Sequence, residues 1–340
     1  MILFLDTVGK QLTVFDLDPD RFESFADYPD LKRAEAPEAI FSDPEIDLVF
    51  IATPNATHFE LATAALRSGK AVLCEKPMAI SIEDAEKMTE LSEELNGFLQ
   101  IGFELRYSKL YTWAKEQIEG GLIGDVVNTQ CTYICSEFHG KGSWRNKRSS
   151  GGGMFGEKLS HYVDLPRWWV SSPVKDVTSF CAPNAIPYYE VRDNYSTTVR
   201  YENGAISHLT FMMAPAASLN HDPLQNHISE HSDDGHELRY LIQGMKGALE
   251  TSVFSRRMRR WAFSDSPTGL RSQVVDDRRW KEDSFEDNRY VHNTTDQTLD
   301  VIRRVAMGEK PATSARDALE TMRVVFAAEK SAGAGVTIAL

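Results

Sequence analysis

The chain has 340 residues, 42% of them apolar and 26% charged, which is the composition of a globular protein long enough for two domains. Its net charge of −13 excludes a surface that follows nucleic-acid phosphates, and it has no apolar run long enough to cross a membrane. Its four cysteines lack metal-binding spacing and indicate reduced thiols, so we expect a cytoplasmic protein.

Strand-like and helix-like segments alternate through the first third of the chain. Ser81 is a typical helix start and Gly69 a typical helix stop in this region. The alternation predicts an α/β domain with a parallel, doubly wound sheet. Its expected strands are 12–17, 47–52, 71–74 and 98–101, and its expected helices are 19–26, 58–68 and 82–95.

After Arg106 the pattern changes to long alternating strands, which predict an α+β domain. Asn203-Gly204, between two of these strands, is a strong hairpin signal. We therefore expect an open antiparallel sheet with helices on one face, and a division into domains 1–104 and 105–340. The expected strands are 126–138, 174–181, 196–201, 205–212, 237–243 and 248–254, and the expected helices are 110–118, 294–307 and 314–332.

Three segments carry polar side chains at places where such folds bind ligands. Glu75-Lys76-Pro77 ends a buried strand, and open α/β sheets bind ligands at the carboxyl ends of their strands. Thr53-Pro54-Asn55 follows the preceding strand in the same way. The glycine triplet 151–153 opens a helix that carries Glu157, His161 and Asp164 at spacings of four and three, which predicts one shared helical face.

In order and spacing, these three segments resemble the Gfo/Idh/MocA family of nicotinamide-dependent oxidoreductases, from about Leu12 onward. The resemblance implies hydride transfer from a sugar or polyol hydroxyl to NAD(P). It implies that His161 accepts the hydroxyl proton, that Lys76 stabilises the developing alkoxide, and that Glu157 orients one of the two. The family usually has Asp where this chain has Glu157.

The resemblance also implies contacts with the cofactor and the substrate. Asp16 ends an early strand, where an acidic residue binds the ribose hydroxyls and favours NAD over NADP, although it could equally be a turn residue. Trp144 could equally be a core residue. The cofactor candidates are Asp16, Thr53, Pro54, Asn55, His58, Glu75, Lys76, Pro77, Trp144 and Arg145, and the substrate candidates are Arg106, Tyr133, His139, Asp164 and Asn194.

The amino terminus departs from the family pattern. A dinucleotide-binding fold needs a first strand, a glycine-rich turn and a helix that holds the pyrophosphate, but Gly9 is the one glycine before Gly69. We expect an incomplete Rossmann-type sheet, with Met1–Val8 a helical remnant or a misplaced strand. Losing two or three hydrogen bonds of about 1.5–3 kcal/mol each would weaken cofactor binding to about millimolar. Either the chain is truncated or it is a poor dehydrogenase.

Other functions remain open at this stage. A non-catalytic cofactor or sugar sensor would explain the missing glycine turn, and a redox-assisted glycosidase would use the same hydride transiently. We expect no nucleic-acid or membrane partner, and a homodimer or homotetramer formed through the antiparallel sheet. The histidine-rich loop does not match the helical-pair or finger spacings of metal ligands, so we expect a solvated loop near the substrate entrance and assign no metal ligands, with an adventitious or real metal site as the open alternative. The loop contains His221, His227, His231, His236, Asp222, Glu230, Asp233 and Asp234.

Overall fold

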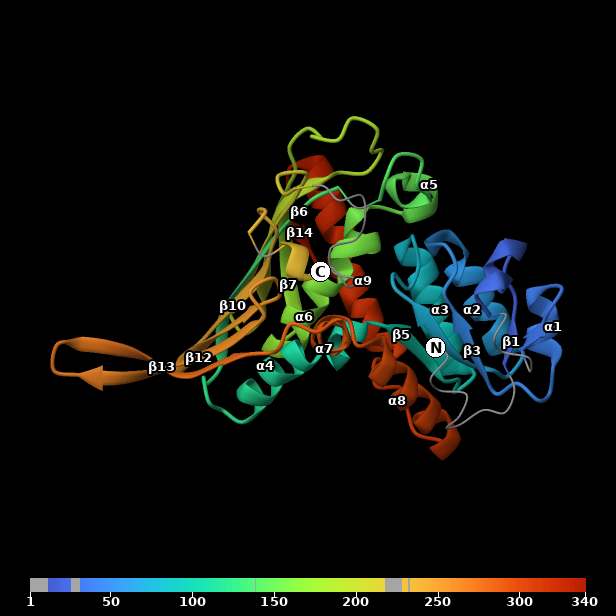
Figure 1. The fold of residues 1–340 in the computed structure, drawn as a ribbon, viewed down its shortest axis with the longest axis horizontal. Helices are drawn as coiled ribbons and strands as arrows, with labels where there is room; N and C mark the ends of the chain where they lie inside the picture. The colour runs from blue at the N-terminus through green and yellow to red at the C-terminus, as the bar shows by residue number, and fades with distance from the viewer. Residues whose placement is uncertain (1–11, 26–30, 138, 218–227, 232) are drawn as a thin grey trace.

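The α/β part of the chain holds its parallel strands in two separate groups (Figure 1). The computed structural model describes residues 12–25, 31–137, 139–217, 228–231 and 233–340. Within these ranges, β1 (Thr13–Val14) pairs with β2 (Lys32–Arg33), and neither joins the three-stranded sheet. That sheet has the order β3 (Leu48–Ile51), β4 (Ala71–Glu75), β5 (Leu99–Gly102). Among the described strands, none joins the two groups; the predictions for Met1–Val8 lie outside the described residues, so the expected gap in the doubly wound sheet stays a prediction.

Most of the expected elements of this part are present, with shorter ends. The strand expected at 12–17 covers two residues, and the helix expected at 19–26 is a 3-10 helix, η2 (Pro19–Phe25). The sequence analysis missed β2 and α1 (Pro37–Ser42). Ser81 caps α3 by accepting a hydrogen bond from the backbone nitrogen of Asp84, as expected. The other helices are η3 (Asn55–Thr57), α2 (His58–Arg67) and α3 (Ile82–Glu94).

The three parallel strands β3, β4 and β5 end at one edge of their sheet. Ile51 is in register with Cys74, and Glu75 is in register with Gly102. Because the strands are parallel, the segments that leave their carboxyl ends lie side by side. These segments are the Thr53–Asn55 turn, the Lys76-Pro77 pair and η4 (Glu104–Tyr107).

The second part of the chain is built on a nine-stranded sheet. Its order is β13-β12-β11-β10-β6-β9-β8-β7-β14, and β6 pairs with β9 in parallel. The sheet is therefore mixed, which corrects the expected antiparallel sheet at one pair. A long crossover between β6 and β9 carries helices and two further strands, and such a connection makes parallel pairing possible. The bounds are β6 (Val126–Cys135), β7 (Val174–Phe180), β8 (Asn194–Tyr201), β9 (Ile206–Met213), β10 (Glu237–Gly244), β11 (Gly247–Ser252), β12 (Arg257–Ser266), β13 (Gly269–Arg279) and β14 (Ile338–Ala339).

Helices cover one face of this sheet, as expected (Figure 1). The long helix α9 packs on β7 of the sheet and on α3 of the α/β part, so it joins the two parts. The buried aromatic rings of Tyr111, Trp169 and Tyr240 pack between these helices and the sheet, with their ring centres within 6.0 Å of one another. The helices are α4 (Lys109–Glu119), η5 (Trp144–Asn146), α5 (Arg148–Gly151), η6 (Phe155–Leu159), α6 (Ser160–Val170), η7 (Ile228–His231), α7 (Ser284–Val291), α8 (Thr294–Met307) and α9 (Ala315–Ala334).

The opposite face of the sheet is open, and the β12–β13 hairpin projects beyond the body of the molecule (Figure 1). The side chains of Phe180, Met212 and Leu241 are exposed on strands of this sheet. In the described part of the chain, no helix combines the length and the apolar character that a membrane crossing requires.

The glycine triplet lets α9 approach the start of η6. Gly153 has a φ of +147°, and a Cβ atom there would lie 2.6 Å from Oε1 of Glu329. That carboxylate accepts hydrogen bonds from the backbone nitrogen of Phe155 (3.2 Å) and from the hydroxyl of Tyr195 (3.0 Å). The triplet therefore sets how the helix that carries His161 begins.

We expect Gly153→Ala to lower the free energy of unfolding by at least about 2 kcal/mol, because the methyl group meets Glu329 and the φ is strained. Gly333→Ala is the matched control, since its Cβ would lie in open space within α9. It should raise stability by about 0.5 kcal/mol. Urea unfolding followed by circular dichroism measures both, and equal effects of the two changes would contradict this reading.

Candidate active site

Lys76 links the carboxyl edge of the parallel sheet to the second part of the chain. Its ammonium donates a hydrogen bond to the backbone carbonyl of Glu157. Glu157 lies in η6, a single π-helical turn directly before α6, which carries His161. The three predicted catalytic residues therefore lie together, and their catalytic roles stay predictions.

Two side chains from the connection between β6 and α5 contact the carboxylate of Glu157. One is an arginine, and the other is a histidine that can carry a positive charge. His139 Nε2 lies 3.0 Å from Oε2, and Arg145 Nε donates to Oε1 at 3.0 Å. Burial alone would raise the pKa of Glu157, but Lys76 and His139 hold that pKa well below its usual range. The carboxylate of Glu157 thus contacts His139 and Arg145 among the described residues, and the expectation that Glu157 orients Lys76 or His161 stays a prediction.

His161 is 3% exposed and has a different carboxylate beside it. Its Nε2 lies 3.2 Å from Oε2 of Glu104, outside good hydrogen-bond alignment. Neither ring nitrogen has a hydrogen-bond partner among the described residues. Burial lowers the pKa of His161, Glu104 raises it, and Lys76 and His292 lower it further. A buried polar group without a partner costs about 1–3 kcal/mol, so the site favours a polar ligand here.

Glu104 bridges His161 to a second imidazole. Its Oε1 lies 2.9 Å from Nδ1 of His292, the residue that ends α7. Burial would raise the pKa of Glu104, but His161 and His292 bring that pKa well below its usual range. The sequence analysis missed both residues. Glu104 follows β5 as Lys76 follows β4, and that position was the available signal; His292 had none.

Glu75 lies at the same edge, but its pKa is shifted in the opposite direction from that of Glu104. Burial and the nearby charge of Glu104 raise the pKa of Glu75 to about 7, and Lys76 opposes this rise. A Cβ atom at Gly102 would lie 2.9 Å from Oε2 of Glu75, so the glycine leaves room for this carboxyl group beside β5. Neighbouring carboxyl groups with diverging pKa values are typical of acid–base sites.

The other cofactor candidates line the same edge or its surroundings. Asn55 donates to the carbonyl of Gly151 at 3.0 Å, and Thr53 is exposed beside it. His58 is buried between two carbonyls, with Nδ1 2.7 Å from Pro77 and Nε2 3.0 Å from Thr53, and burial lowers its pKa. His58 thus connects the turn after β3 with the turn after β4. Pro54 is exposed next to Thr53.

Two cofactor candidates lie further from this edge. Asp16 is exposed after β1, and its Oδ1 accepts from the backbone nitrogen of Asp18 at 2.9 Å. The guanidinium of Arg145 lies 4.5 Å from the centre of the Trp144 ring. Trp144 is half-buried, so it is neither fully core nor fully free. Direct cofactor contacts by all of these residues stay predictions.

Of the five substrate candidates, one contacts the catalytic candidate Glu157, and the other four contact residues elsewhere in the structure. His139 contacts Glu157 and stacks on Tyr189 with ring centres 6.3 Å apart. Arg106 forms a two-pronged ion pair with Asp164, both bonds 2.7 Å long. This buried pair also reaches α9, through Arg106 to Asp317 and through Asp164 to Thr321. Glu157 and Asp164 thus bind different partners, although they were expected to share one face.

The last two substrate candidates stabilise the second part of the chain. Tyr133 is fully buried, with its ring centre 5.0 Å from that of Tyr162 and 5.3 Å from that of Phe211. Asn194 binds the loop that precedes it: its Oδ1 accepts a hydrogen bond from the backbone nitrogen of Ala182 at 2.7 Å. Substrate contact by either residue stays a prediction.

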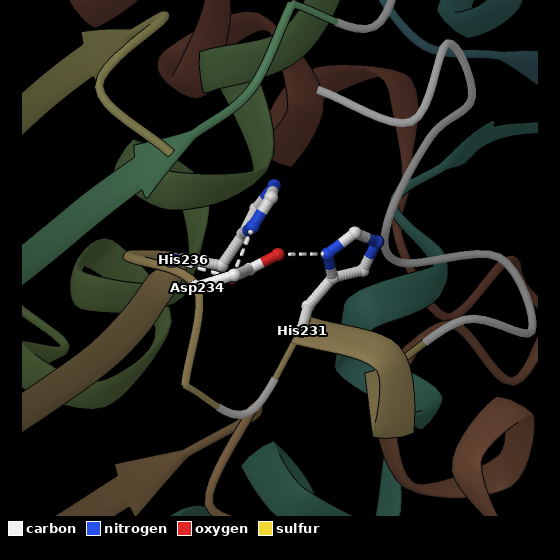
Figure 2. A group of neighbouring side chains, drawn as sticks. All are labelled: His231, Asp234 and His236. Atoms are coloured by element: carbon white, nitrogen blue, oxygen red, sulfur yellow. Dashed lines mark hydrogen bonds and ion pairs between the residues drawn. The ribbon is translucent and has the colours of Figure 1, made fainter. Parts of the chain in front are cut away.

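Three residues of the histidine-rich loop form a compact cluster (Figure 2). Asp234 lies between the two rings, 2.5 Å from Nδ1 of His231 and 2.8 Å from Nδ1 of His236. Two ligands on one zinc ion lie about 3.3 Å apart, so these are hydrogen-bond separations. Ser136 donates its backbone N–H to Nε2 of His236, which places that ring's proton on Nδ1, facing Asp234. In this geometry the cluster ties β6 to β10; His221, His227 and Asp222 lie outside the described residues.

Two family models match the chain. Residues 7–103 match the model described as "Oxidoreductase family, NAD-binding Rossmann fold", and residues 115–340 match "Oxidoreductase family, C-terminal alpha/beta domain". Both carry the name Gfo/Idh/MocA, and together they cover nearly the whole sequence.

Curated relatives match over part of their length. The chain is 31% identical over 193 residues to levoglucosan dehydrogenase of Pseudarthrobacter phenanthrenivorans, covering 49% of this chain and 50% of that one. It is 30% identical over 162 residues to the uncharacterized oxidoreductase YdgJ of Escherichia coli, covering 48% and 46%. The matches thus span about half the length of these relatives.

Solved structures share the fold over nearly the whole chain. Levoglucosan dehydrogenase in complex with NADH and levoglucosan superposes with a TM-score of 0.77 at 21% identity, covering 97% of this chain and 90% of that one. A putative myo-inositol dehydrogenase from Sinorhizobium meliloti gives a TM-score of 0.74 at 21% identity, covering 96% and 91%. At this identity the likeness establishes the architecture.

The raised pKa of Glu75 predicts a pH-dependent stability. Because the folded-state pKa of about 7 lies above the ordinary value of 4.5 for a glutamate, the folded protein binds more protons between these values, and stability falls as pH rises through this window. Glu75→Gln should therefore raise the free energy of unfolding by about 1–3 kcal/mol at about pH 8, with a smaller gain at about pH 5. Urea unfolding at both pH values measures this.

The control for this experiment is Glu60→Gln, which changes an exposed carboxyl group on α2. It should alter stability by less than about 0.5 kcal/mol at either pH. A gain from Glu75→Gln that does not depend on pH would contradict the assignment.

Proposed function

Because the chain belongs to the Gfo/Idh/MocA oxidoreductase family, we propose that it transfers hydride between a nicotinamide cofactor and a hydroxyl-bearing carbon of a sugar or polyol. The observation that carries this proposal is the buried imidazole of His161. Among the described residues its Nδ1 has no hydrogen-bond partner and its Nε2 has only the poorly aligned carboxylate of Glu104 nearby, next to Lys76 at the carboxyl edge of the parallel sheet. A substrate hydroxyl there would complete the hydrogen bonding.

The proposed mechanism assigns one task to each side chain. His161, whose pKa is lowered mainly by burial, is neutral near pH 7 and accepts the hydroxyl proton. Lys76 donates from its ammonium to the alkoxide that forms, leaving the carbonyl of Glu157. Glu157 stays ionised and keeps His139 and Arg145 beside Lys76. The nicotinamide ring, when bound, supplies the hydride acceptor.

The cofactor would be held along the carboxyl edge of the sheet. The exposed turn of Thr53 and Pro54 and the lysine after β4 fit the nicotinamide half of NAD. Asp16, exposed after β1, fits the ribose hydroxyls of the adenine half and disfavours a 2′-phosphate. Because the described strands form two separate groups and the sequence has no glycine between Gly9 and Gly69, we expect weak binding of NAD, near millimolar.

The assembly and location follow from other features. We place the domain division at 104/105, between the two matched models.

Exposed apolar side chains such as Phe180 and Met212 favour a homodimer or homotetramer through the open sheet face, which light scattering would detect as a mass of two or four chains. No disulfide joins the four cysteines, all of which lie in the described ranges, which favours a cytoplasmic location.

A non-catalytic sensor is the second candidate. The split of the parallel sheet into β1-β2 and β3-β4-β5 favours it, because weak cofactor binding suits a protein that does not turn over. The grouping of half-buried Lys76 with buried Glu157 and His161 favours the enzyme, since a sensor has no need of a base and an electrophile in one site. A redox-assisted glycosidase would use the same residues and would cleave a glycoside without net consumption of NAD.

We expect Lys76→Ala and His161→Ala each to lower turnover by about 10²-fold or more, because each removes charge stabilisation or the base. The double change should cost less than the product of the single changes, because both residues act in one transition state. Polyol and sugar oxidation with NAD at about millimolar concentration, followed by NADH absorbance, measures this.

The control for turnover is Asn203→Ala, in a hairpin turn of the second part. It should retain turnover. Unchanged turnover in His161→Ala would remove the proposed base, and fully multiplicative losses in the double variant would mean that the two residues serve separate steps.

A further inference from the structure

A single buried carboxylate lies between two imidazoles at the candidate site. Glu104 Oε2 is 3.2 Å from His161 Nε2, and its Oε1 is 2.9 Å from His292 Nδ1. The three side chains come from α6, from the segment after β5, and from the end of α7. The exposed fraction of the side chain is 4% for His161, 7% for Glu104 and 18% for His292, so water screens their charges little.

The charges that face His161 from its neighbours act in opposite directions. Lys76 after β4 and His292 after α7 both disfavour a positive charge on its ring, and burial does the same. Glu104 is the group that favours that charge. Glu157, on the turn before His161, has its carboxylate engaged by His139 and Arg145.

We propose that Glu104 is the positioning residue of this site, holding His161 through Nε2 and stabilising the imidazolium that forms when Nδ1 takes a substrate proton. A neutral imidazole carries one proton, and with a carboxylate beside Nε2 that proton lies on Nε2. The lone pair then lies on Nδ1, which has no partner among the described residues. The hydroxyl proton moves to Nδ1, and Glu104 stays ionised.

His292 completes the arrangement by keeping Glu104 ionised. Its ring donates to the carboxyl oxygen that His161 does not face, and this contact opposes the rise in pKa that burial would cause. Removing His292 would therefore have two opposed effects on the pKa of His161: the loss of a neighbouring group that disfavours charge would raise it, and weaker ionisation of Glu104 would lower it. A shift of one defined sign is expected only when Glu104 itself is changed.

The test is an NMR titration of the histidine ring signals in the full chain without cofactor, which does not depend on turnover. Glu104→Gln should lower the pKa of His161 by about one unit or more, and Glu104→Asp should lower it less. Unchanged titration of His161 in folded Glu104→Gln, or an upward shift there, would overturn the proposal.

The chain offers a matched control for this titration. Asp234 also lies between two imidazoles, those of His231 and His236 (Figure 2). Asp234→Asn should leave the titration of His161 unchanged, although it removes the same kind of charge. A shift of similar size in this control would show a general effect of net charge and would also overturn the proposal.

The chemical part of the proposal rests on the proposed function, and its outcome can be separated from that function. If the wild-type chain oxidises a polyol, Glu104→Gln should lower kcat by about 10²-fold with little change in KM and move the acidic limb of the pH profile down with the NMR pKa. If no alcohol is oxidised but the NMR shifts appear, the positioning role holds and the proposed function fails.

Discussion

The site depends on the hydrogen bond from the Lys76 ammonium to the backbone carbonyl of Glu157. This bond joins the end of a parallel strand to the start of the helix that carries His161. The carbonyl that accepts it belongs to the π-helical turn of η6, and single turns of this kind occur frequently at functional sites. The Gly151–Gly153 triplet precedes that turn, and its close approach to Glu329 sets where the turn begins. A change at the triplet would therefore move Lys76's partner as well as the helix.

Three glutamates near this bond differ in charge because their neighbours differ. Glu157 has a lysine and a histidine close by, and Glu104 has two histidines, so both remain ionised despite burial. Glu75 has Glu104 as a neighbour and holds its proton to about pH 7. Only when one carboxyl of that pair keeps its proton can the other remain charged beside His161 at modest cost. The protonation of Glu75 and the basicity of His161 are thus coupled through Glu104.

Local patterns predicted much of this arrangement, and long-range contacts account for the rest. Lys76 could be placed because a strand end is a local feature, and the same argument would have found Glu104 after β5. The contact from His292 joins residues 188 positions apart, and no local pattern indicates such a contact. The parallel pairing of β6 with β9 is similarly a property of the whole sheet. The strand β13 was missed because both of its faces are largely exposed, so its sequence lacks apolar alternation.

The two halves of the proposed cofactor site belong to different groups of strands. The residues for hydride chemistry follow β3, β4 and β5, which form one buried sheet, while Asp16 follows β1, which pairs only with β2 among the described strands. Cofactor affinity comes largely from the phosphates and the adenine half, whereas the rate of the chemical step comes from groups around the nicotinamide. The chain can therefore bind NAD weakly and still keep a complete set of acid–base groups. Weak affinity alone would not distinguish a sensor from an enzyme, because the residues that decide between them lie on the intact sheet.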